Sequence, residues 1–232
     1  KLGGQELGYG SDLDLVFVTD ASYEGQTDGQ RPIEVQQFYL RLAQRVLHLF
    51  TTRTVAGILY DVDLRLRPSG QAGLLVTQVS SFVRYLREDA WTWELQALVR
   101  ARPVFGVPAL RDTVMDIRRS VLAQPRDEKE LRQSIVDMRE KMREHLTRKN
   151  SQMFDLKQDV GGIADIEFIT QYLVLRYADK YPELCQYSDN IRLLTEAQQQ
   201  HLLSDMDAQN LINAFRIFRC ESHSLALQGE QL

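Results

Sequence analysis

The chain has few cysteines, no excess of positive charge and no long apolar run. Cys185 and Cys220 are the only cysteines among 232 residues, too few for a disulfide framework or a cysteine-based zinc site, which favours a reducing, cytoplasmic environment. The 28 basic and 32 acidic residues give a formal net charge of −4, so no overall positive field attracts nucleic acid. No segment has the length of a membrane span. We therefore expect a soluble globular protein whose partners include neither nucleic acid nor a membrane.

The opening stretch places two carboxylates on one face of a predicted strand. It reads KLGGQELGYGSDLDLVFVTD, in which apolar residues at 13, 15 and 17 alternate with Asp12 and Asp14. This period of two is typical of a strand with one buried face, so both carboxylates are expected on the other face. Because the chain begins so close to Gly3-Gly4, with no element before it, we interpret the sequence as part of a longer protein.

A second alternating segment supplies a third carboxylate. It covers residues 58–68, ILYDVDLRLRP, and has Asp63, Arg65 and Arg67 on its polar face. The turn residues that follow it predict a hairpin with a short partner strand over 74–77. Between the two strands, residues 21–33 have the composition of a long loop, and the three- and four-residue spacing of apolar side chains over 35–49 predicts an amphipathic helix.

The remainder of the sequence is predicted to be helical. Apolar side chains recur at helical spacing over 79–88, 91–101, 108–123, 128–149, 162–180, 188–202 and 205–227. The segment Ala-Gln-Pro-Arg-Asp interrupts this pattern at 123–127. We therefore predict the α+β class, with a small sheet flanked by helices over residues 1–122 and an all-α helical bundle over residues 123–232.

The three aspartates indicate a metal-dependent reaction. Asp12 and Asp14 repel each other unless a positive charge lies between them, and Mg²⁺ is usually held by one or two carboxylates together with substrate phosphates. Asp63 offers a third oxygen ligand from a second strand. Three carboxylates from two strands suit a two-metal phosphoryl or nucleotidyl transfer. An Asp-x-Asp pair alone is more often found on a solvated strand face. The metal site is favoured by the combination of a preceding Gly-Gly, Ser-Asp-Leu-Asp at a strand start and a second strand with an aspartate followed by arginines.

Several neighbouring residues are candidates for phosphate binding. Gly3 and Gly4 would allow close approach of a triphosphate, and Ser11 offers a hydroxyl and an amide. The guanidinium groups of Arg65 and Arg67 suit phosphate oxygens.

Further along the chain, three residues predict an anion site at the start of a helix, namely Lys157, Gly161 and Gly162. An ordinary loop is the alternative reading of this glycine pair.

Other residues allow two readings each. For Trp91 and Trp93, core packing is favoured over stacking on adenine. Arg100 and Arg102 are assigned equally to phosphate contact or to surface charge. Asp165 and Glu167 point to different faces of one helix, so at most one faces the site, and Asp165 is preferred.

At this point the residues resemble a known family. Gly3-Gly4 followed by GSDLD is similar to the nucleotide-binding strand of the DNA polymerase β-type nucleotidyltransferase superfamily. Nearly the whole chain resembles the bifunctional glutamine synthetase adenylyltransferase/adenylyl-removing enzymes, through the blocks FYLRLAQRVLHLFTTRT, GILYDVDLRLRPSGQAGLLVT, AWTWELQALVRARPVFG and FDLKQDVGGIADIEFITQYLVLRY. The segments RPSG, LLVT and AWTWE are similar to the C-terminal half, which in this family transfers AMP from ATP to a tyrosine of glutamine synthetase.

This resemblance implies a function and its partners. It implies metal ligation by Asp12 and Asp14 with Asp63 as third ligand, Mg²⁺ or Mn²⁺ as the metal, and ATP as substrate. It also implies that 1–122 is an N-terminally truncated nucleotidyltransferase domain, that glutamine synthetase is the protein substrate, and that glutamine and the PII signal protein are regulators. The alternatives are the half that removes AMP by phosphorolysis, or a non-catalytic docking module. Three mutually repelling carboxylates argue against the latter.

Overall fold

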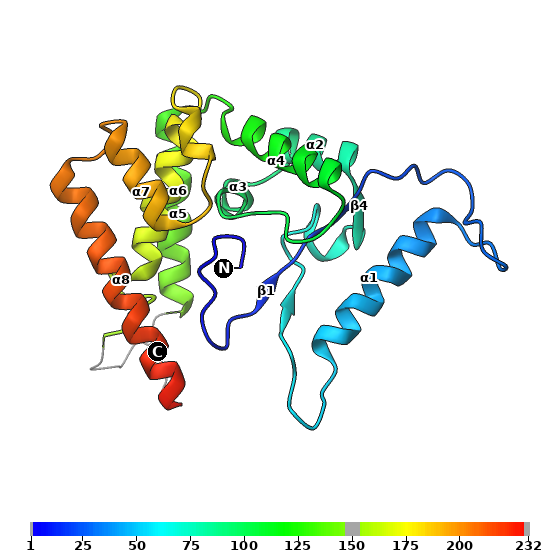
Figure 1. Ribbon diagram of the computed structural model, residues 1–232. Coiled ribbons are helices and arrows are strands. Elements are labelled where there is room, and N and C mark those ends of the chain that lie inside the picture. The colour runs from blue at the N-terminus through cyan, green and yellow to red at the C-terminus, as the bar shows by residue number, and fades with distance from the viewer. Residues whose placement is uncertain (1, 147–153, 230–232) are drawn as a thin grey trace.

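The computed structural model describes residues 2–146 and 154–229. In Figure 1, α1 lies at one end of the molecule and α5 to α8 form the other, with β1 and the N-terminal segment between them. The α+β class is confirmed, with short parallel strand pairs and a majority of helix. In the described residues, no helix is both long and apolar enough to span a bilayer.

Four short strands form two parallel pairs. β1 (Leu13–Asp14) pairs with β3 (Val62–Asp63), and β2 (Phe17–Thr19) pairs with β4 (Val76–Gln78). The predicted hairpin between residues 58–68 and 74–77 is therefore wrong. β3 and β4 do not pair with each other, because each pairs in parallel with a different part of the opening stretch. Side-chain alternation shows which face of a strand is buried, and it does not show which distant strand is the partner.

The predicted helices are present with nearly the expected bounds. The first four are α1 (Val35–Thr51), α2 (Val79–Glu88), α3 (Thr92–Val99) and α4 (Pro108–Leu122). The next four are α5 (Glu128–Leu146), α6 (Ile163–Tyr177), α7 (Asn190–Gln199) and α8 (Asp205–Gln228). Short 3₁₀ turns, η1 (Gly70–Ala72) and η2 (Pro182–Cys185), lie between them. Residues 147–149, the end of the helix predicted over 128–149, lie outside the described residues.

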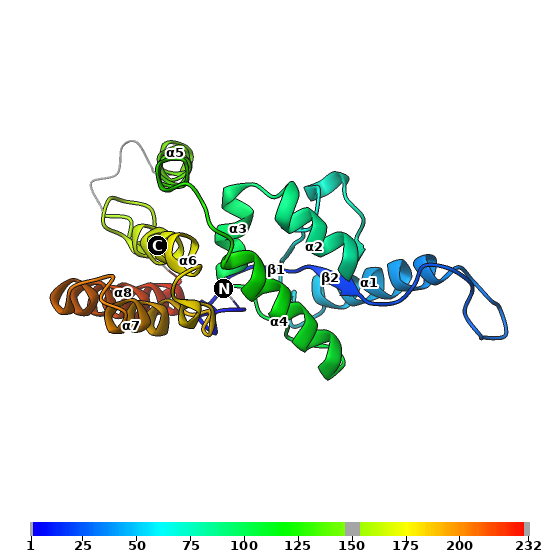
Figure 2. The same cartoon turned by 90° about the horizontal axis from the view of Figure 1, so that it is seen from above.

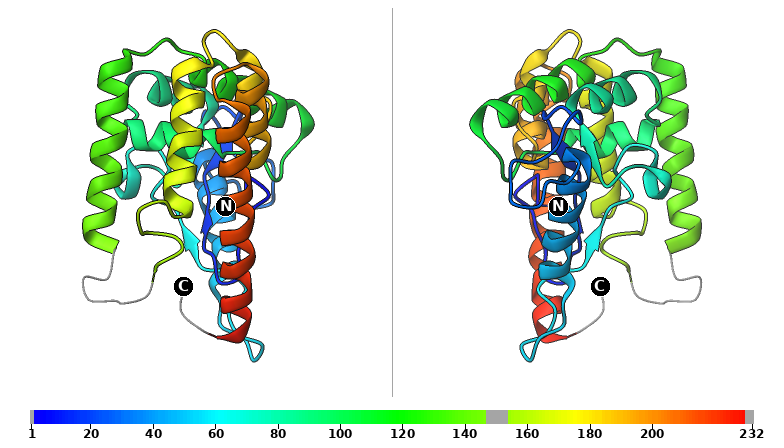
Figure 3. Two further views of the ribbon diagram at one scale, coloured as in Figure 1. Left: turned by 90° about the vertical axis from the view of Figure 1, so that its left-hand side faces the viewer. Right: turned by 90° about the vertical axis from the view of Figure 1, so that its right-hand side faces the viewer.

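The helices share a core that crosses the predicted domain boundary. The side views show α6 between α5 and the α7–α8 pair (Figure 3). The largest buried cluster joins α2, α3 and α4 to α5, α6 and α7. Arg118 of α4 is 1% exposed, and its guanidinium donates to carbonyl oxygens of Leu98 and Val99 on one side and of Cys185 and Tyr187 on the other. Burial lowers its pKa to about 10. The division at residue 122 stays a prediction.

The segment before β1 is held by several helices. Arg100, 5% exposed, pairs with Glu6 of this segment and with Glu167 of α6. Glu6 also accepts the backbone amide of Asn190 at 3.0 Å. Seen from above, the segment lies between α4 and the helices α6 to α8 (Figure 2), and Arg219 of α8 donates to the Glu6 carbonyl oxygen at 3.0 Å. The helical part of the molecule therefore fixes the approach of the chain to β1.

Candidate functional site

The parallel pairing of β1 with β3 brings the three aspartates together. Asp14 is the register partner of Asp63, and Asp12 lies two residues before Asp14 on the same strand face. Leu13, on the opposite face, is 4% exposed. One carboxylate oxygen from each of Asp12, Asp14 and Asp63 lies within 4.8 Å of the others. Local alternation and strand pairing thus place three negative charges at one point, where a cation relieves their repulsion.

Arg65 places a positive group at this cluster. Its Nε lies 2.7 Å from Asp63 Oδ2, its Nη2 makes an ion pair with the same oxygen, and its backbone amide donates to Oδ1 at 2.8 Å. The hydrogen bond that Arg65 donates to Asp63 raises the pKa of the Arg65 guanidinium, as do the charges of Asp63, Asp14 and Asp12. The Asp63 side chain accepts the Arg65 backbone amide and forms a local turn. β3 therefore ends at Asp63, whereas the alternating pattern predicted a strand that continues beyond it.

Arg67 closes the loop that follows β3. Its guanidinium donates to carbonyl oxygens of Leu64 at 3.1 Å, of Gln71 at 3.0 Å and of Gly73 at 3.2 Å. These three bonds leave two of the five guanidinium N–H donors. Arg67 therefore shapes this loop, and its contact with phosphate stays a prediction.

An open pocket lies in front of the carboxylates. Its volume is about 720 Å³, within the usual range for small-molecule sites. The lining comprises Asp12, Asp61, Val62, Asp63, Leu64, Arg65, Arg67 and Gln71. Asp61 was not among the predicted site residues, although its position on the polar face of the alternating segment was a signal for it. The pocket is thus lined mainly by the residues at and after β3.

Gly3 and Gly4 approach protein backbone closely. A Cβ atom on Gly3 would lie 2.2 Å from the Arg100 carbonyl oxygen, and one on Gly4 would lie 2.8 Å from that of Ser188. These contacts give the pair a packing reason to be glycine, because the space that a side chain would fill is taken by Arg100, directly after α3, and by Ser188, before α7. The nucleotide role of Gly3 and Gly4 stays a prediction. Ser11 directly precedes the cluster, and its amide donates to the Gly8 carbonyl oxygen at 3.2 Å.

At the start of α6, where Lys157, Gly161 and Gly162 predict an anion site, the chain itself engages the first amides of the helix, and the anion site stays a prediction. The first amides of the helix, those of Ile163 and Ala164, donate to the carbonyl oxygens of Leu156 at 2.8 Å and Lys157 at 3.1 Å. The Gly161 amide donates to Asp165 Oδ2 at 2.7 Å. The chain itself thus satisfies the amides that an anion would need.

The glycine pair of that loop serves its shape. Gly161 has a φ of +84°, which favours glycine, and a Cβ atom on Gly162 would lie 2.7 Å from the Leu156 carbonyl oxygen. Lys157 is an exposed member of the same loop.

The acidic residues of α6 pair with arginines. Asp165 binds Arg139 of α5 at 2.5 Å, and Glu167 binds Arg100. The preference for Asp165 as a site residue is not supported, because its carboxylate serves the contact between α5 and α6. Arg100 is neither a phosphate ligand nor a surface charge, since it is buried between two carboxylates, and Arg102 donates to the Gly3 carbonyl oxygen at 3.2 Å.

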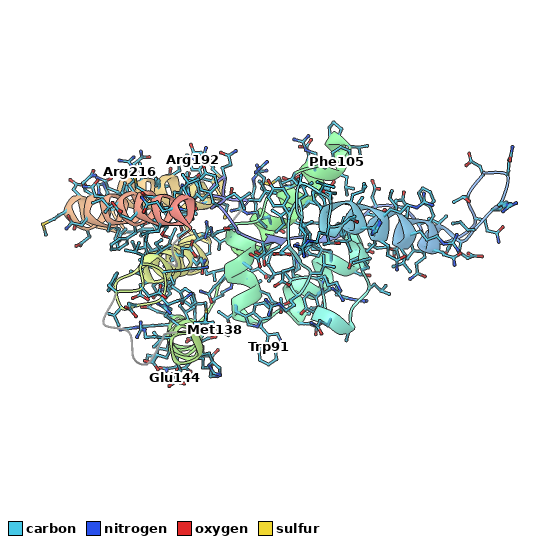
Figure 4. The ribbon with its side chains drawn as sticks, turned by 90° about the horizontal axis from the view of Figure 1, so that it is seen from below. Trp91, Phe105, Met138, Glu144, Arg192 and Arg216 are labelled. Carbon is cyan, nitrogen blue, oxygen red and sulfur yellow. The ribbon has the colours of Figure 1, made fainter. Side chains whose placement is uncertain are left out.

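Trp91 and its neighbours differ from the predicted core packing. Trp91 is 70% exposed and projects outward from the start of α3 (Figure 4), while Trp93 is half-buried. Glu94 is the buried residue here, and its Oε2 accepts the Trp91 amide at 2.9 Å. Its carboxylate also accepts the Tyr85 hydroxyl at 2.8 Å. Glu94 belongs to the same group for which core packing is predicted, and its place three residues after the N-cap Trp91 is typical of a capping glutamate.

The strand pairs, the flanking helices and the aspartate cluster are compatible with the nucleotidyltransferase class. Residues 1–116 match the family model described as glutamate-ammonia ligase adenylyltransferase, and the chain belongs to this family. Residues 136–231 match the model described as GlnD PII-uridylyltransferase. The chain is 90% identical, over all of its 232 residues, to a bifunctional glutamine synthetase adenylyltransferase/adenylyl-removing enzyme of Idiomarina loihiensis. It spans 24% of the length of that relative.

Proposed function

We propose that the chain carries the adenylylating activity of its family, the transfer of AMP from ATP to a tyrosine hydroxyl of glutamine synthetase. The observation that carries this proposal is the convergence of three carboxylates from β1 and β3 within 4.8 Å at an open pocket. Asp12, Asp14 and Asp63 form an all-oxygen donor set, which suits Mg²⁺ or Mn²⁺. When bound, the metal supplies electrostatic stabilisation of the charge that develops on the phosphates.

The reaction needs no covalent enzyme intermediate. The tyrosine oxygen of the protein substrate forms a bond to the α-phosphorus of ATP, the bond from that phosphorus to the bridging oxygen breaks, and pyrophosphate leaves with its electron pair. The tyrosine proton is released. Asp12, Asp14 and Asp63 would hold the cation, Arg65 lines the same pocket and would contact the phosphates, and the loop shaped by Arg67 also lines this pocket. Positioning and charge stabilisation are the main contributions in this chemistry.

Regulation by glutamine and by the PII signal protein is proposed for the longer polypeptide. The match of residues 136–231 to a PII-uridylyltransferase model supports a link between the helical region and this signalling system. The contacts of Glu6 with Arg100, Asn190 and Arg219 join that region to the segment before β1. They supply a physical route by which a change among the helices reaches the carboxylates.

The decisive experiment replaces Asp14 by Asn. We expect Asp14→Asn to abolish labelling of glutamine synthetase with radioactive AMP from ATP while leaving the circular dichroism spectrum unchanged, because an amide loses the charge that holds the cation. Asp116→Asn is the matched control, since Asp116 is an exposed carboxylate of α4. Full labelling by Asp14→Asn would refute the metal role. Formation of ADP from adenylylated glutamine synthetase and phosphate, without AMP transfer, would assign the chain to the phosphorolytic removal of AMP.

A further inference from the structure

The ion pair between Arg65 and Asp63 occupies a group that the proposed metal needs. Asp63 Oδ2 accepts from Arg65 Nε at 2.7 Å and from Nη2, and Oδ1 accepts the Arg65 amide at 2.8 Å. Each carboxylate oxygen has a second lone pair, so the pair weakens the hold of Asp63 on a cation without closing the site. A cation at the cluster competes with the guanidinium for the same negative charge.

The surroundings of Arg65 allow it to leave. Its side chain is 71% exposed, whereas that of Asp63 is 15% exposed. The two residues are two positions apart in the chain, so breaking the pair separates no helices or strands. Exposed pairs of this kind contribute little to stability. The backbone hydrogen bond from the Arg65 amide keeps Asp63 oriented toward the cluster when the guanidinium moves.

We propose that Arg65 is an exchangeable counter-ion, which neutralises Asp63 while no cation is bound and is displaced by the cation, so that its guanidinium becomes available to the phosphates of the nucleotide. The carboxylates of the cluster repel one another, and the ion pair with Arg65 offsets part of that repulsion at Asp63. When a metal–nucleotide complex arrives, the cation takes over the carboxylates and the phosphates bring new negative charge. A guanidinium suits both partners, because its planar donors match carboxylate and phosphate oxygens alike. This inference rests on the proposed metal site.

The exchange predicts effects of opposite sign for the metal alone and for the metal with nucleotide. In Arg65→Gln, the affinity for Mn²⁺ alone is expected to rise about threefold. The cation no longer has to displace the guanidinium, and the free energy of an exposed ion pair corresponds to a change of this size. The affinity for the Mn²⁺ complex of α,β-methylene-ATP is expected to fall about tenfold, through loss of a charge-assisted hydrogen bond. Arg65→Lys keeps the charge without the planar fork, so both effects are expected to be smaller than in Arg65→Gln.

The experiment follows free Mn²⁺ by electron paramagnetic resonance during titration of the folded 232-residue chain, with and without the ATP analogue. The matched control is Arg119→Gln, which removes an exposed arginine that is paired with Asp116 at 2.9 Å on α4; neither affinity is expected to change. Circular dichroism confirms that each variant is folded.

The outcomes separate this inference from the proposed function. If the unaltered chain binds Mn²⁺ and Asp63→Asn weakens binding, the metal site stands, and a rise in Mn²⁺ affinity in Arg65→Gln supports the exchange. An unchanged or reduced Mn²⁺ affinity in Arg65→Gln overturns the exchange alone. If neither the unaltered chain nor Arg65→Gln binds Mn²⁺, with or without the analogue, the metal role of the carboxylates is refuted and the exchange with it.

Discussion

Two arginines of this chain pair with carboxylates in opposite surroundings. Arg100 is 5% exposed and lies between Glu6 and Glu167, which are 94 and 67 residues away in the sequence. Arg65 is 71% exposed, and its partner Asp63 is two residues away. The buried pair joins separate elements of the fold, whereas the exposed pair belongs to one turn.

The difference shows how the same chemistry serves stability in one place and ligand binding in the other. Burial lowers the pKa of Arg100, but the charges of Glu167 and Glu6 outweigh it, so the pKa is raised overall. Removing one partner of such a group leaves buried charge without compensation. At the edge of β1 and β3, three carboxylates of different exposure share a solvent-facing pocket with Arg65. The comparison is therefore between a buried charge network that joins distant elements and a charged cluster that faces a pocket.

Loss of the buried arginine is expected to have the largest effect. Arg100→Met should lower the free energy of unfolding by about 2–4 kcal/mol, because it removes the arginine charge that two partly buried carboxylates share. Urea unfolding followed by circular dichroism measures this change. Arg119→Met, the same substitution at an exposed arginine, should change it by less than about 0.5 kcal/mol. Equal effects in the two variants would mean that the buried network contributes no more than a surface charge.

At the carboxylate cluster, loss of one charged group is expected to raise the free energy of unfolding rather than lower it. Without divalent cation, Asp12→Asn should raise the free energy of unfolding by about 0.5 kcal/mol, because it removes one of three repelling charges. With Mg²⁺ at ten times its dissociation constant, the unaltered chain should gain about 1.4 kcal/mol by linkage and the variant less. Thermal unfolding with and without Mg²⁺ measures both, with Asp116→Asn as the control. If Asp12→Asn lowers the stability without metal and gains as much stability from Mg²⁺ as the unaltered chain does, Asp12 neither repels its neighbours nor binds the cation.

The helices of the fold were predictable, because their signal is local. The segment predicted over 79–88 coincides with α2, and the one predicted from residue 205 begins where α8 begins. The strand pairing was not predictable in the same way. Residues 74–77 follow a turn after β3, which is typical of a hairpin, yet β4 pairs with β2 in parallel. Such pairing is decided by packing between distant segments, and alternation records only which face of a strand is buried.

The candidate site was predictable where neighbouring positions decide the geometry. Asp12 and Asp14 share a face because side chains alternate along a strand, and the structure brings Asp63 beside them. The roles of Gly3 and Arg100 were not predictable, because their partners come from distant elements. A glycine that admits a nucleotide and a glycine that admits another backbone have the same sequence pattern, and only the tertiary contacts separate them.

The smallest effect is expected in the pH dependence of the buried network. Burial is the main cause that raises the pKa of Glu6, with Arg100 acting against it. Because the folded pKa is higher than the unfolded value, the folded state holds the Glu6 proton more tightly. This contribution to stability is complete below the unfolded pKa and is lost as the pH rises through the folded pKa.

Replacing Glu6 by Gln isolates this contribution. The difference in unfolding free energy between Glu6→Gln and the unaltered chain should shift in favour of the variant as the pH rises from about 4.5 to 7, the range that begins near the unfolded pKa of a glutamate. Urea unfolding at several pH values measures this slope, and Glu88→Gln, at an exposed position of α2, controls for the substitution itself. A shift in the opposite direction would mean that the charge of Arg100 outweighs burial at Glu6 and lowers its pKa. The buried network would then favour ionised carboxylates, as the exposed cluster does.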